Sequence, residues 1–388
     1  MSQTALSKGR IRPEASYGTK AFVQRGKIDL TFLTLVAILM TIGLICLFSA
    51  SYANALQNYN DAYKFIKQQF LWAVAGIIIM LVISKINVDL LRRSAWGIYG
   101  LAIALLIIVL FMPKISNVHR WISIGSVTFQ PSEIAKFAIV VLFSHLIAAN
   151  YRNMTRFTFG ILFLGFLLGV VCALVVIEPH LSATILIFAI GVVLMFIGGI
   201  KLRYVLIPMA AGIGLVLVAV FGRVITYANS RIEFWLDPWS APGKEGYQTI
   251  QSLIAIGSGG LMGQGIGNSN QKQLYVPEPQ NDFIFSIVCE ELGFIGALCI
   301  IVLFALLVWR GFVIAMRAPD KFRSLLAIGL TFCIGLQAAL NIMVVTNTIP
   351  NTGISLPFFS YGGTALVITL AEMGVVLSIS RSSTVSKT

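Results

Sequence analysis

The chain has 388 residues, of which 57% are hydrophobic and only 11% charged, and its mean hydropathy is +0.89. This composition excludes a soluble domain, which must cover its surface with polar groups, and it excludes a disordered chain. The net charge of +13 does not indicate nucleic-acid binding, because no soluble basic domain with interleaved aromatic residues is present to hold nucleic acid.

Long apolar segments predict an all-α polytopic membrane protein. A spanning helix needs roughly 20 mostly apolar residues, and ten segments meet that requirement. They lie at about 29–51, 67–86, 94–112, 132–149, 156–177, 181–199, 202–222, 283–309, 324–345 and 362–380. We therefore expect ten transmembrane helices.

The distribution of lysine and arginine predicts the orientation. With the amino terminus inside, 19 of the 28 basic residues fall in cytoplasmic segments and 8 in external ones, as the positive-inside rule requires. Both termini are then cytoplasmic. Residues 1–28 form a basic tail that we expect to be disordered and not a cleavable signal, residues 29–381 form the transmembrane domain, and residues 382–388 form a second short tail.

The external segment before the fourth span carries charged and aromatic residues. In "NVHRWISIGSVTFQPSEIAKF", Arg120 and Trp121 are adjacent and Pro131 suits the first turn of a helix. Glu133 and Lys136 then share one helix face. Ionisable residues within a span are costly unless they are paired or functional, so the pair indicates either a polar cavity or an ion pair that orients the helix.

Cysteine and histidine give no sign of a metal site. The five cysteines all fall inside apolar spans without CxxC spacing, so we interpret them as packing residues. The three histidines are too scattered in the sequence to predict metal ligation by side chains alone.

The longest external loop covers residues 222–281 and contains too many apolar residues to be disordered. Within it, "TIQSLIAIGSGG" predicts a short amphipathic helix that ends at glycine. The glycine-rich run at 257–267 matches neither GxxxxGK[ST] nor GxGxxG, and no strand precedes it. We therefore interpret it as a set of tight turns at the membrane surface.

Four acids gather where this loop enters the eighth span, in "VPEPQNDFIFSIVCEELGF". Asp282 stands at the start of the predicted helix, whereas Glu290 and Glu291 lie roughly 12 Å deeper at about 1.5 Å per residue. They cannot share a site with Asp282, so we expect them to make buried hydrogen bonds between helices. Glu278 is expected at the loop surface or in contact with a substrate.

The last external segment, "NTIPNTGISLPFFSYGGTAL", has two prolines and three glycines but no charge. Irregular backbone of this kind is tolerated at membrane depth only where protein or a water-filled cavity surrounds it.

Together, "RWISIGSVTFQPSEIAKF", "GYQTIQSLIAIGSGGLMGQGIGNS", "VPEPQNDFIFSIVCEELG" and "GISLPFFSYGG" resemble the SEDS family (shape, elongation, division and sporulation), which includes FtsW, RodA and SpoVE. The resemblance runs from about 29 to 381 and is nearest to FtsW. It implies a ten-span fold in the bacterial plasma membrane. It also implies a peptidoglycan glycosyltransferase that polymerises lipid II at the outer face during cell division.

The resemblance also assigns residues. The essential acid of the family's long external loop matches Asp282, which would be the catalytic general base, with its pKa raised by partial desolvation. Candidate substrate-binding residues in or beside the shared motifs are Arg120, Trp121, Glu133, Lys136, Gln248, Lys272, Ser360 and Tyr361. The cations Arg120, Lys136 and Lys272, or a divalent ion such as Mg²⁺ or Mn²⁺, would meet the leaving pyrophosphate. No nucleotide or organic cofactor is expected.

The chain departs from the family pattern at three places. Asn281 replaces a frequent threonine, and in "EPHLSAT" His180 and Ser182 replace an acid and a glycine of many relatives. Any role of that acid is therefore in doubt here. Glu372 in the last span has no counterpart that we can assign.

Three other functions remain open from the sequence. A lipid II flippase would need a charged path through both leaflets and often has internal repeats, of which we find none. A RodA-like elongation polymerase and a structural scaffold are the others. The resemblance implies a class B penicillin-binding protein (a transpeptidase) and other division-complex membrane proteins as partners, and no nucleic acid.

Overall fold

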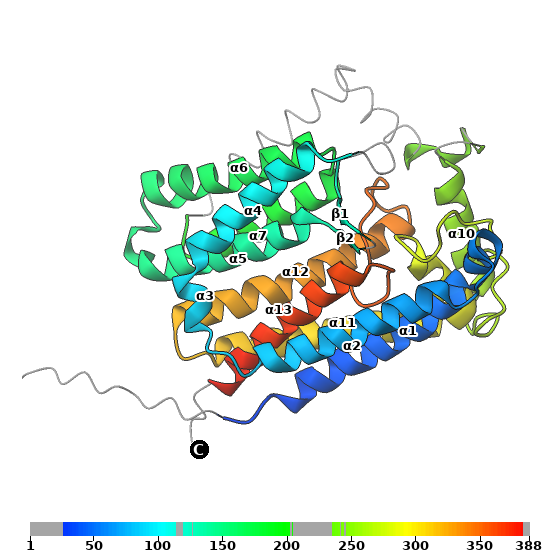
Figure 1. Ribbon diagram of the computed structural model, residues 1–388, viewed down its shortest axis with the longest axis horizontal. Helices are drawn as coiled ribbons and strands as arrows, with labels where there is room; N and C mark the ends of the chain where they lie inside the picture. Colours follow the sequence, from blue (N-terminus) through cyan, green and yellow to red (C-terminus); the bar gives the residue numbers. More distant parts are fainter. Residues whose placement is uncertain are drawn as a thin grey trace, which may run out of the picture.

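The computed structural model describes residues 26–113, 119–125, 127–201, 204, 235–240, 242–243 and 246–382, and within them the chain is a bundle of long helices (Figure 1). The α-helices are α1 (Leu30–Tyr59), α2 (Lys64–Ile83), α3 (Asp89–Arg93), α4 (Ala95–Leu110), α5 (Pro131–Ala149), α6 (Leu164–Ile177), α7 (Leu181–Ile197), α10 (Tyr247–Gly259), α11 (Ile284–Met316), α12 (Lys321–Val345) and α13 (Gly363–Arg381).

Nine of the ten predicted spans coincide with described helices. Seven helical segments are long and apolar enough to cross a membrane, and α4 and α7 are shorter apolar helices. Their bounds follow the sequence pattern closely, although α1 and α11 run several residues farther than predicted. The predicted seventh span, 202–222, lies outside the described residues, so the total of ten stays a prediction.

The side chains are distributed as a bilayer requires. The outer helices expose large apolar residues, among them Phe70 and Leu71 of α2, Phe166 of α6 and Phe294 of α11. The central helix α5 is largely buried and packs against α4, α7 and α12, while α13 packs closely against α2. Exposed apolar side chains suit contact with lipid, and the buried centre is where the chain places its polar residues.

The prediction of an entirely helical protein missed one small sheet. Strands β1 (Ile122–Ile124) and β2 (Val127–Phe129) pair in antiparallel register just before α5. A turn begins at Gly125, whose φ of +63° suits a tight hairpin. Short irregular helices, η1 (Tyr151–Asn153), η2 (Thr158–Phe163) and η3 (Pro238–Ser240), complete the described elements.

The predicted amphipathic helix is α10, and it ends beside a break in α11. Gly293 leaves helical geometry at φ 68° and ψ −171°, and the turn after α10 pairs with the backbone around it. Gln264 N donates to Glu290 O at 2.9 Å, and Phe294 N donates to Gly260 O at 2.9 Å. The glycine-rich run thus begins inside α10 and forms the predicted tight turns only after Gly259. These turns also join α10 to α11 through their backbones.

We expect Gly263→Ala to destabilise the fold strongly. Gly263 has φ +78°, and a Cβ there would collide with the backbone carbonyl of Glu291. The unfavourable backbone conformation alone costs about 1–2 kcal/mol, and the collision adds to that. Chemical denaturation in detergent measures the loss. The matched control is Gly257→Ala, in the same run but within α10 and with open space around it, which should raise stability by about 0.5–1 kcal/mol; equal effects of the two changes would contradict this account.

The two ends of the described chain meet. Gly26 N donates to Arg381 O at 2.7 Å, and Asp29 N donates to Ser380 Oγ at 3.2 Å. The roots of both tails therefore lie at the same end of the bundle, as the predicted topology requires. The side of the membrane that they face stays a prediction, and the tails 1–25 and 383–388 lie outside the described residues.

Candidate functional site

Asp282 lies in the turn that leads into α11 and is half-buried. Its backbone carbonyl accepts a hydrogen bond of 2.7 Å from Asn341 Nδ2 of α12, and the same amide donates to Ile354 O at 2.6 Å. Asn341 is fully buried. One side chain of α12 therefore fixes both the acid and the last external segment, which holds the carboxylate in one place relative to the bundle.

The last external segment is fastened to the residues just before Asp282. Ser360 Oγ donates to Asn281 O at 2.8 Å, and Tyr361 N donates to Gln280 O at 2.8 Å. Tyr361 Oη donates to Gln68 Oε1 of α2 at 2.7 Å. Ser360 and Tyr361, predicted to contact a substrate, thus support the loop that carries Asp282.

Gly353 allows this segment to approach the carboxylate. A Cβ at Gly353 would lie 3.3 Å from Asp282 Oδ2, and its φ is +72°, a conformation that favours glycine. On the neighbouring side, Gln248 Nε2 of α10 donates to Pro277 O at 3.4 Å, and Gln248 Oε1 accepts from Asn351 Nδ2 at 3.3 Å. Gln248 therefore links the acidic loop to the same segment.

The pKa of Asp282 is raised to about 6: burial contributes most of the increase, the negative charge of Glu278 adds to it, and the positive charge of Arg120 opposes it. The direction agrees with the prediction of partial desolvation. Glu278 is exposed on the loop surface, where its carboxylate accepts from Asn281 Nδ2 at 2.8 Å. A carboxylate with a pKa near 6 is ionised at neutral pH and is a stronger base than an ordinary aspartate.

Arg120 lies against the turn between α6 and α7. Its Nε donates to Glu178 O at 3.5 Å, and its Nη2 donates to Pro179 O. The pKa of Glu178 is raised to about 8, because the effect of burial exceeds the opposing effect of the Arg120 charge. The positive charge of Arg120 thus lowers the pKa of both Glu178 and Asp282. Trp121 beside it is half-buried.

His180 is buried in a neutral form. Its Nδ1 lies 3.2 Å from Gln130 Nε2 and 3.4 Å from Ser132 Oγ. Burial lowers its pKa to about 3, and the charges of Arg120 and Lys136 act in the same direction. The histidine therefore adds no positive charge near Asp282 at neutral pH.

Glu133 and Lys136 form an ion pair, one of the two alternatives that the sequence left open, with Lys136 Nζ 2.8 Å from Glu133 Oε2. Lys136 Nζ also donates to Gln337 Oε1 of α12 at 2.8 Å, and Gln337 Nε2 donates to Ser355 O at 3.1 Å. Both charged side chains are largely buried. The pair thus connects α5 through α12 to the last external segment, so it orients helices whether or not it also contacts a substrate.

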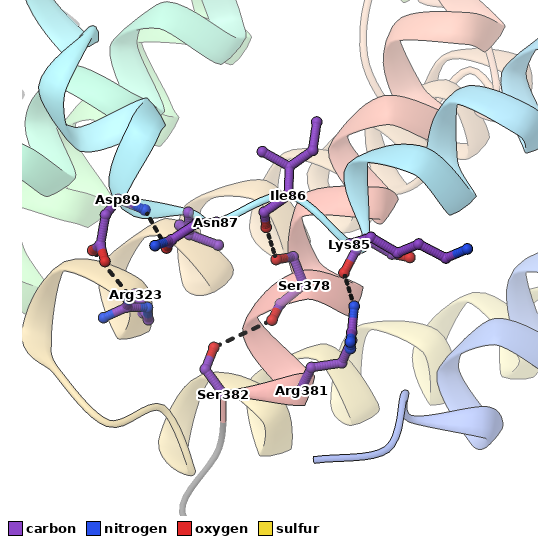
Figure 2. Close-up of a pocket in the computed structure, with 10 residues that line it drawn as sticks. Lys85, Ile86, Asn87, Asp89, Arg323, Ser378, Arg381 and Ser382 are labelled. Carbon is purple, nitrogen blue, oxygen red and sulfur yellow. Dashed lines mark hydrogen bonds and ion pairs between the residues drawn. The ribbon is translucent and has the colours of Figure 1, made fainter. Parts of the chain in front are cut away.

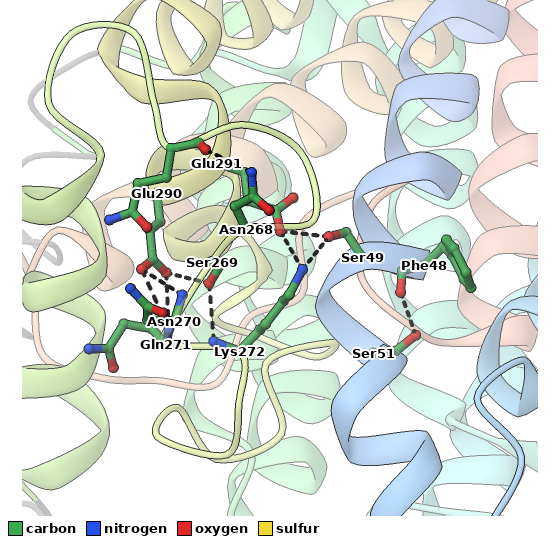
Figure 3. A network of polar contacts seen from close by, with 11 residues as sticks. Phe48, Ser49, Ser51, Asn268, Ser269, Asn270, Gln271, Lys272, Glu290 and Glu291 are labelled. Atoms are coloured by element: carbon green, nitrogen blue, oxygen red, sulfur yellow. Dashed lines mark hydrogen bonds and ion pairs between the residues drawn. The ribbon is translucent and has the colours of Figure 1, made fainter.

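Lys272 belongs to a separate cluster (Figure 3). Its Nζ lies 2.9 Å from Glu291 Oε1 and 3.0 Å from Ser49 Oγ of α1, and Ser49 Oγ donates to Glu291 at 2.6 Å. Glu291 therefore makes the inter-helix contact that we predicted. Glu290 does not: its carboxylate accepts from Ser269 Oγ and from the amides of Asn270 and Gln271, so it holds the loop and joins no second helix.

The structure therefore links most of the predicted residues to the loop that carries Asp282. Ser360, Tyr361 and Gln248 bond to that loop. The charge of Arg120 acts on Asp282, and the Glu133–Lys136 pair is connected through Gln337 to the last external segment. Sequence reasoning missed Asn341, Gln337, Gln130 and Gly353. Polar residues inside an apolar span mark functional or buried polar sites, and that signal was available for Asn341 and Gln337.

No arrangement of three or more His, Cys, Asp or Glu side chains that could hold a metal ion occurs among the described residues. All five cysteines are free; Cys46, Cys289 and Cys333 are buried, Cys172 is half-buried and Cys299 is exposed on the outer part of α11.

Comparison with known proteins identifies the family of this chain. Residues 29–385 match the family described as cell cycle protein, FtsW/RodA/SpoVE. The chain is 39% identical over 368 residues to stage V sporulation protein E of Bacillus subtilis (strain 168), covering 91% of this chain and 97% of that protein. It is 36% identical over 359 residues to the probable peptidoglycan glycosyltransferase FtsW of Geobacter sp. (strain M18), covering 91% and 96%.

Solved structures agree. A chain from a structure described as "Structural coordination of polymerization and crosslinking by a peptidoglycan synthase complex" is similar with a TM-score of 0.77 and 27% identity, covering 91% of this chain and 98% of that chain. The crystal structure of the Thermus thermophilus rod shape determining protein RodA is similar with a TM-score of 0.68 and 25% identity, covering 91% and 97%.

Proposed function

Because this chain belongs to the FtsW, RodA and SpoVE family of cell cycle proteins, we propose that it is a peptidoglycan glycosyltransferase that polymerises lipid II at the outer face of the bacterial plasma membrane. The observation that carries the proposal is Asp282: a half-buried carboxylate with a raised pKa, fixed by Asn341 and approached by the glycine-bearing external segment.

The reaction joins two lipid-linked disaccharides. A hydroxyl of the acceptor sugar attacks the anomeric carbon of the donor, the new glycosidic bond forms with inversion, and the bond to undecaprenyl pyrophosphate breaks. An alcohol is a poor nucleophile until its proton has an acceptor. Asp282 takes that proton, and its ionised state at neutral pH together with its raised basicity supports this role.

The leaving pyrophosphate gains negative charge in the transition state and needs positive groups nearby. Arg120 is the first candidate, since its charge already acts at Asp282. Lys136 is paired with Glu133, and Lys272 with Glu291, so neither carries an unbalanced charge. A requirement for Mg²⁺ or Mn²⁺ stays a prediction.

The relatives named FtsW and SpoVE support a role in division or sporulation more than in elongation. The structural relative from a complex that couples polymerization with crosslinking supports a class B penicillin-binding protein as partner. Glycan strands made by this chain would then be cross-linked by that transpeptidase. Lipid II, the partner and other division-complex proteins are proposals that follow from the family.

The proposal is tested with purified, reconstituted protein, alone and with each candidate transpeptidase of the same cell. We expect fluorescent or radiolabelled lipid II to be converted into glycan strands that a muramidase digests. The rival function, a flippase, would move lipid II between leaflets of proteoliposomes without lengthening it. Translocation without polymer would overturn the proposal.

The pH dependence of polymerisation should report Asp282. A general base must be ionised, so kcat/KM should rise with pH, with a midpoint near the pKa of about 6, and should fall about tenfold per pH unit below it. Glu278→Gln removes a negative charge that raises this pKa, so the midpoint should move to lower pH. A midpoint that does not respond to Glu278→Gln would show that another group titrates.

A further inference from the structure

A polar cavity of about 240 Å³ lies at the opposite end of the bundle from Asp282, where the end of α2, the start of α12 and the end of α13 meet (Figure 2). Its walls are fixed by hydrogen bonds: Ser378 Oγ donates to Ile86 O at 2.6 Å, and Arg381 Nη1 donates to Ser84 O at 3.1 Å. In the predicted topology this is the cytoplasmic rim of the membrane domain.

The cavity carries excess positive charge. Lys85, Arg323 and Arg381 line it together with one acid, Asp89. Arg323 is balanced by Asp89, at 2.9 Å, and by Asp320. Among the described residues neither Lys85 nor Arg381 forms an ion pair. The cavity therefore holds positive charge that no acid among the described residues balances.

The surroundings favour an anion from outside the chain. Gly26, which bonds to Arg381 O, follows a segment whose residues 1–25 contain five lysines and arginines and one acid. A basic segment would be repelled by Lys85 and Arg381. Guanidinium and ammonium groups together instead match a phosphate, which arginine binds through paired N–H donors.

Apolar residues beside the cavity identify the source of the phosphate. Val82, near the end of α2, and Ile86, in the turn that follows it, are 53% and 42% exposed, and they continue the apolar exposed surface of that helix. A phosphate in the cavity could therefore keep its acyl chains in the bilayer along α2. Basic pockets between transmembrane helices on the cytoplasmic side are suited to anionic lipid headgroups.

We propose that the cavity between α2, α12 and α13 binds the phosphate headgroup of an anionic phospholipid from the cytoplasmic leaflet, with Lys85 and Arg381 as the charged contacts. The bound lipid would join the ends of α2 and α13. At their opposite ends, Gln68 and Gln69 of α2 bond to Tyr361 and Gly362, which lie just before α13 in the segment that contacts the Asp282 loop. The site does not depend on the polymerase activity, because it lies apart from the reacting groups.

Native mass spectrometry and thermal unfolding of the full chain in detergent test the proposal, with phosphatidylglycerol and phosphatidylcholine as probes. We expect phosphatidylglycerol to bind at least about tenfold more tightly and to raise the unfolding midpoint, since hydrogen bonds from lysine and arginine to a net anionic headgroup are charge-assisted. Lys85→Glu, and separately Arg381→Gln, should remove most of this preference. Lys85 is exposed, so its variant should fold even if the Arg381 variant does not.

Lys201→Glu is the matched control, because Lys201 is an exposed residue after α7 that does not line the cavity. It should keep the phosphatidylglycerol preference within about twofold. An equal loss of the phosphatidylglycerol preference in Lys201→Glu and Lys85→Glu would show that the preference comes from general surface charge, and it would overturn the proposed site. Protection by inorganic phosphate equal to that by the lipid would overturn its assignment to a lipid, and an unchanged preference in Lys85→Glu would overturn both.

Discussion

Asp282→Asn should abolish glycan-strand synthesis while leaving the protein folded. The amide is nearly the same size as the carboxylate, and Asn341 contacts only the backbone of this residue, so the loop should keep its position. The substitution removes the only group in the proposal that accepts the proton of the attacking hydroxyl. Loss of a general base typically lowers the rate by about 10²- to 10⁴-fold, which should appear in single-turnover reactions with labelled lipid II.

The matched control is Asp61→Asn, the same substitution in another predicted external loop. Asp61 is an exposed acid paired with Lys67 at 3.0 Å, and we expect its variant to polymerise at the rate of the unaltered protein. Binding of lipid II to the Asp282→Asn protein should persist, since the remaining contacts are unchanged. Polymer formed at more than about a tenth of the normal rate would remove Asp282 from the role of base.

Lys272→Met should give the largest loss of stability. It leaves the carboxylate of Glu291, which is 4% exposed, inside the protein without its cation. Breaking a buried pair by removing one partner costs about 3–5 kcal/mol. Chemical denaturation in detergent measures this loss. The double variant Lys272→Met/Glu291→Gln should recover much of it, because no buried charge then remains and Ser49 can still donate to the amide oxygen.

Lys67→Met provides the comparison, because the Lys67–Asp61 pair has a similar distance but is 65% and 42% exposed. Such surface pairs contribute about 0–1 kcal/mol. The activity of folded Lys272→Met protein separates the two roles considered for this lysine. If Lys272 is only structural, we expect less than about a tenfold loss of polymerisation per folded molecule. A larger loss, with stability unchanged, would place Lys272 at the pyrophosphate.

The sequence predicted the helices well because a membrane-spanning helix is recognised from one continuous segment. A span needs a run of apolar residues of a certain length, and nine such runs became α1, α2, α4, α5, the segment through α6, α7, α11, α12 and α13. The Glu133–Lys136 pair was also predictable, because residues three apart on a helix face one another. Both signals lie within a single segment.

Other features depend on segments that are far apart in the sequence. The β1–β2 hairpin was too short to leave a periodic signal, and Glu290 was predicted to join helices but holds its own loop. Lys272 had the same charge as Arg120 in the sequence, and only the fold gave it Glu291 as a partner. Counting charges in a sequence cannot show which lysine is paired with an acid in the folded protein.

By itself the sequence determined a helical membrane protein, the order of its spans and the acid at the mouth of α11. Only the tertiary structure decided what surrounds that acid: Asn341 from α12, Gly353 from the last external segment and the charge of Arg120 from the loop before α5. The reason is physical. The pKa of a carboxyl group depends on burial and on charges within a few ångströms, and helix packing, not sequence spacing, sets those distances.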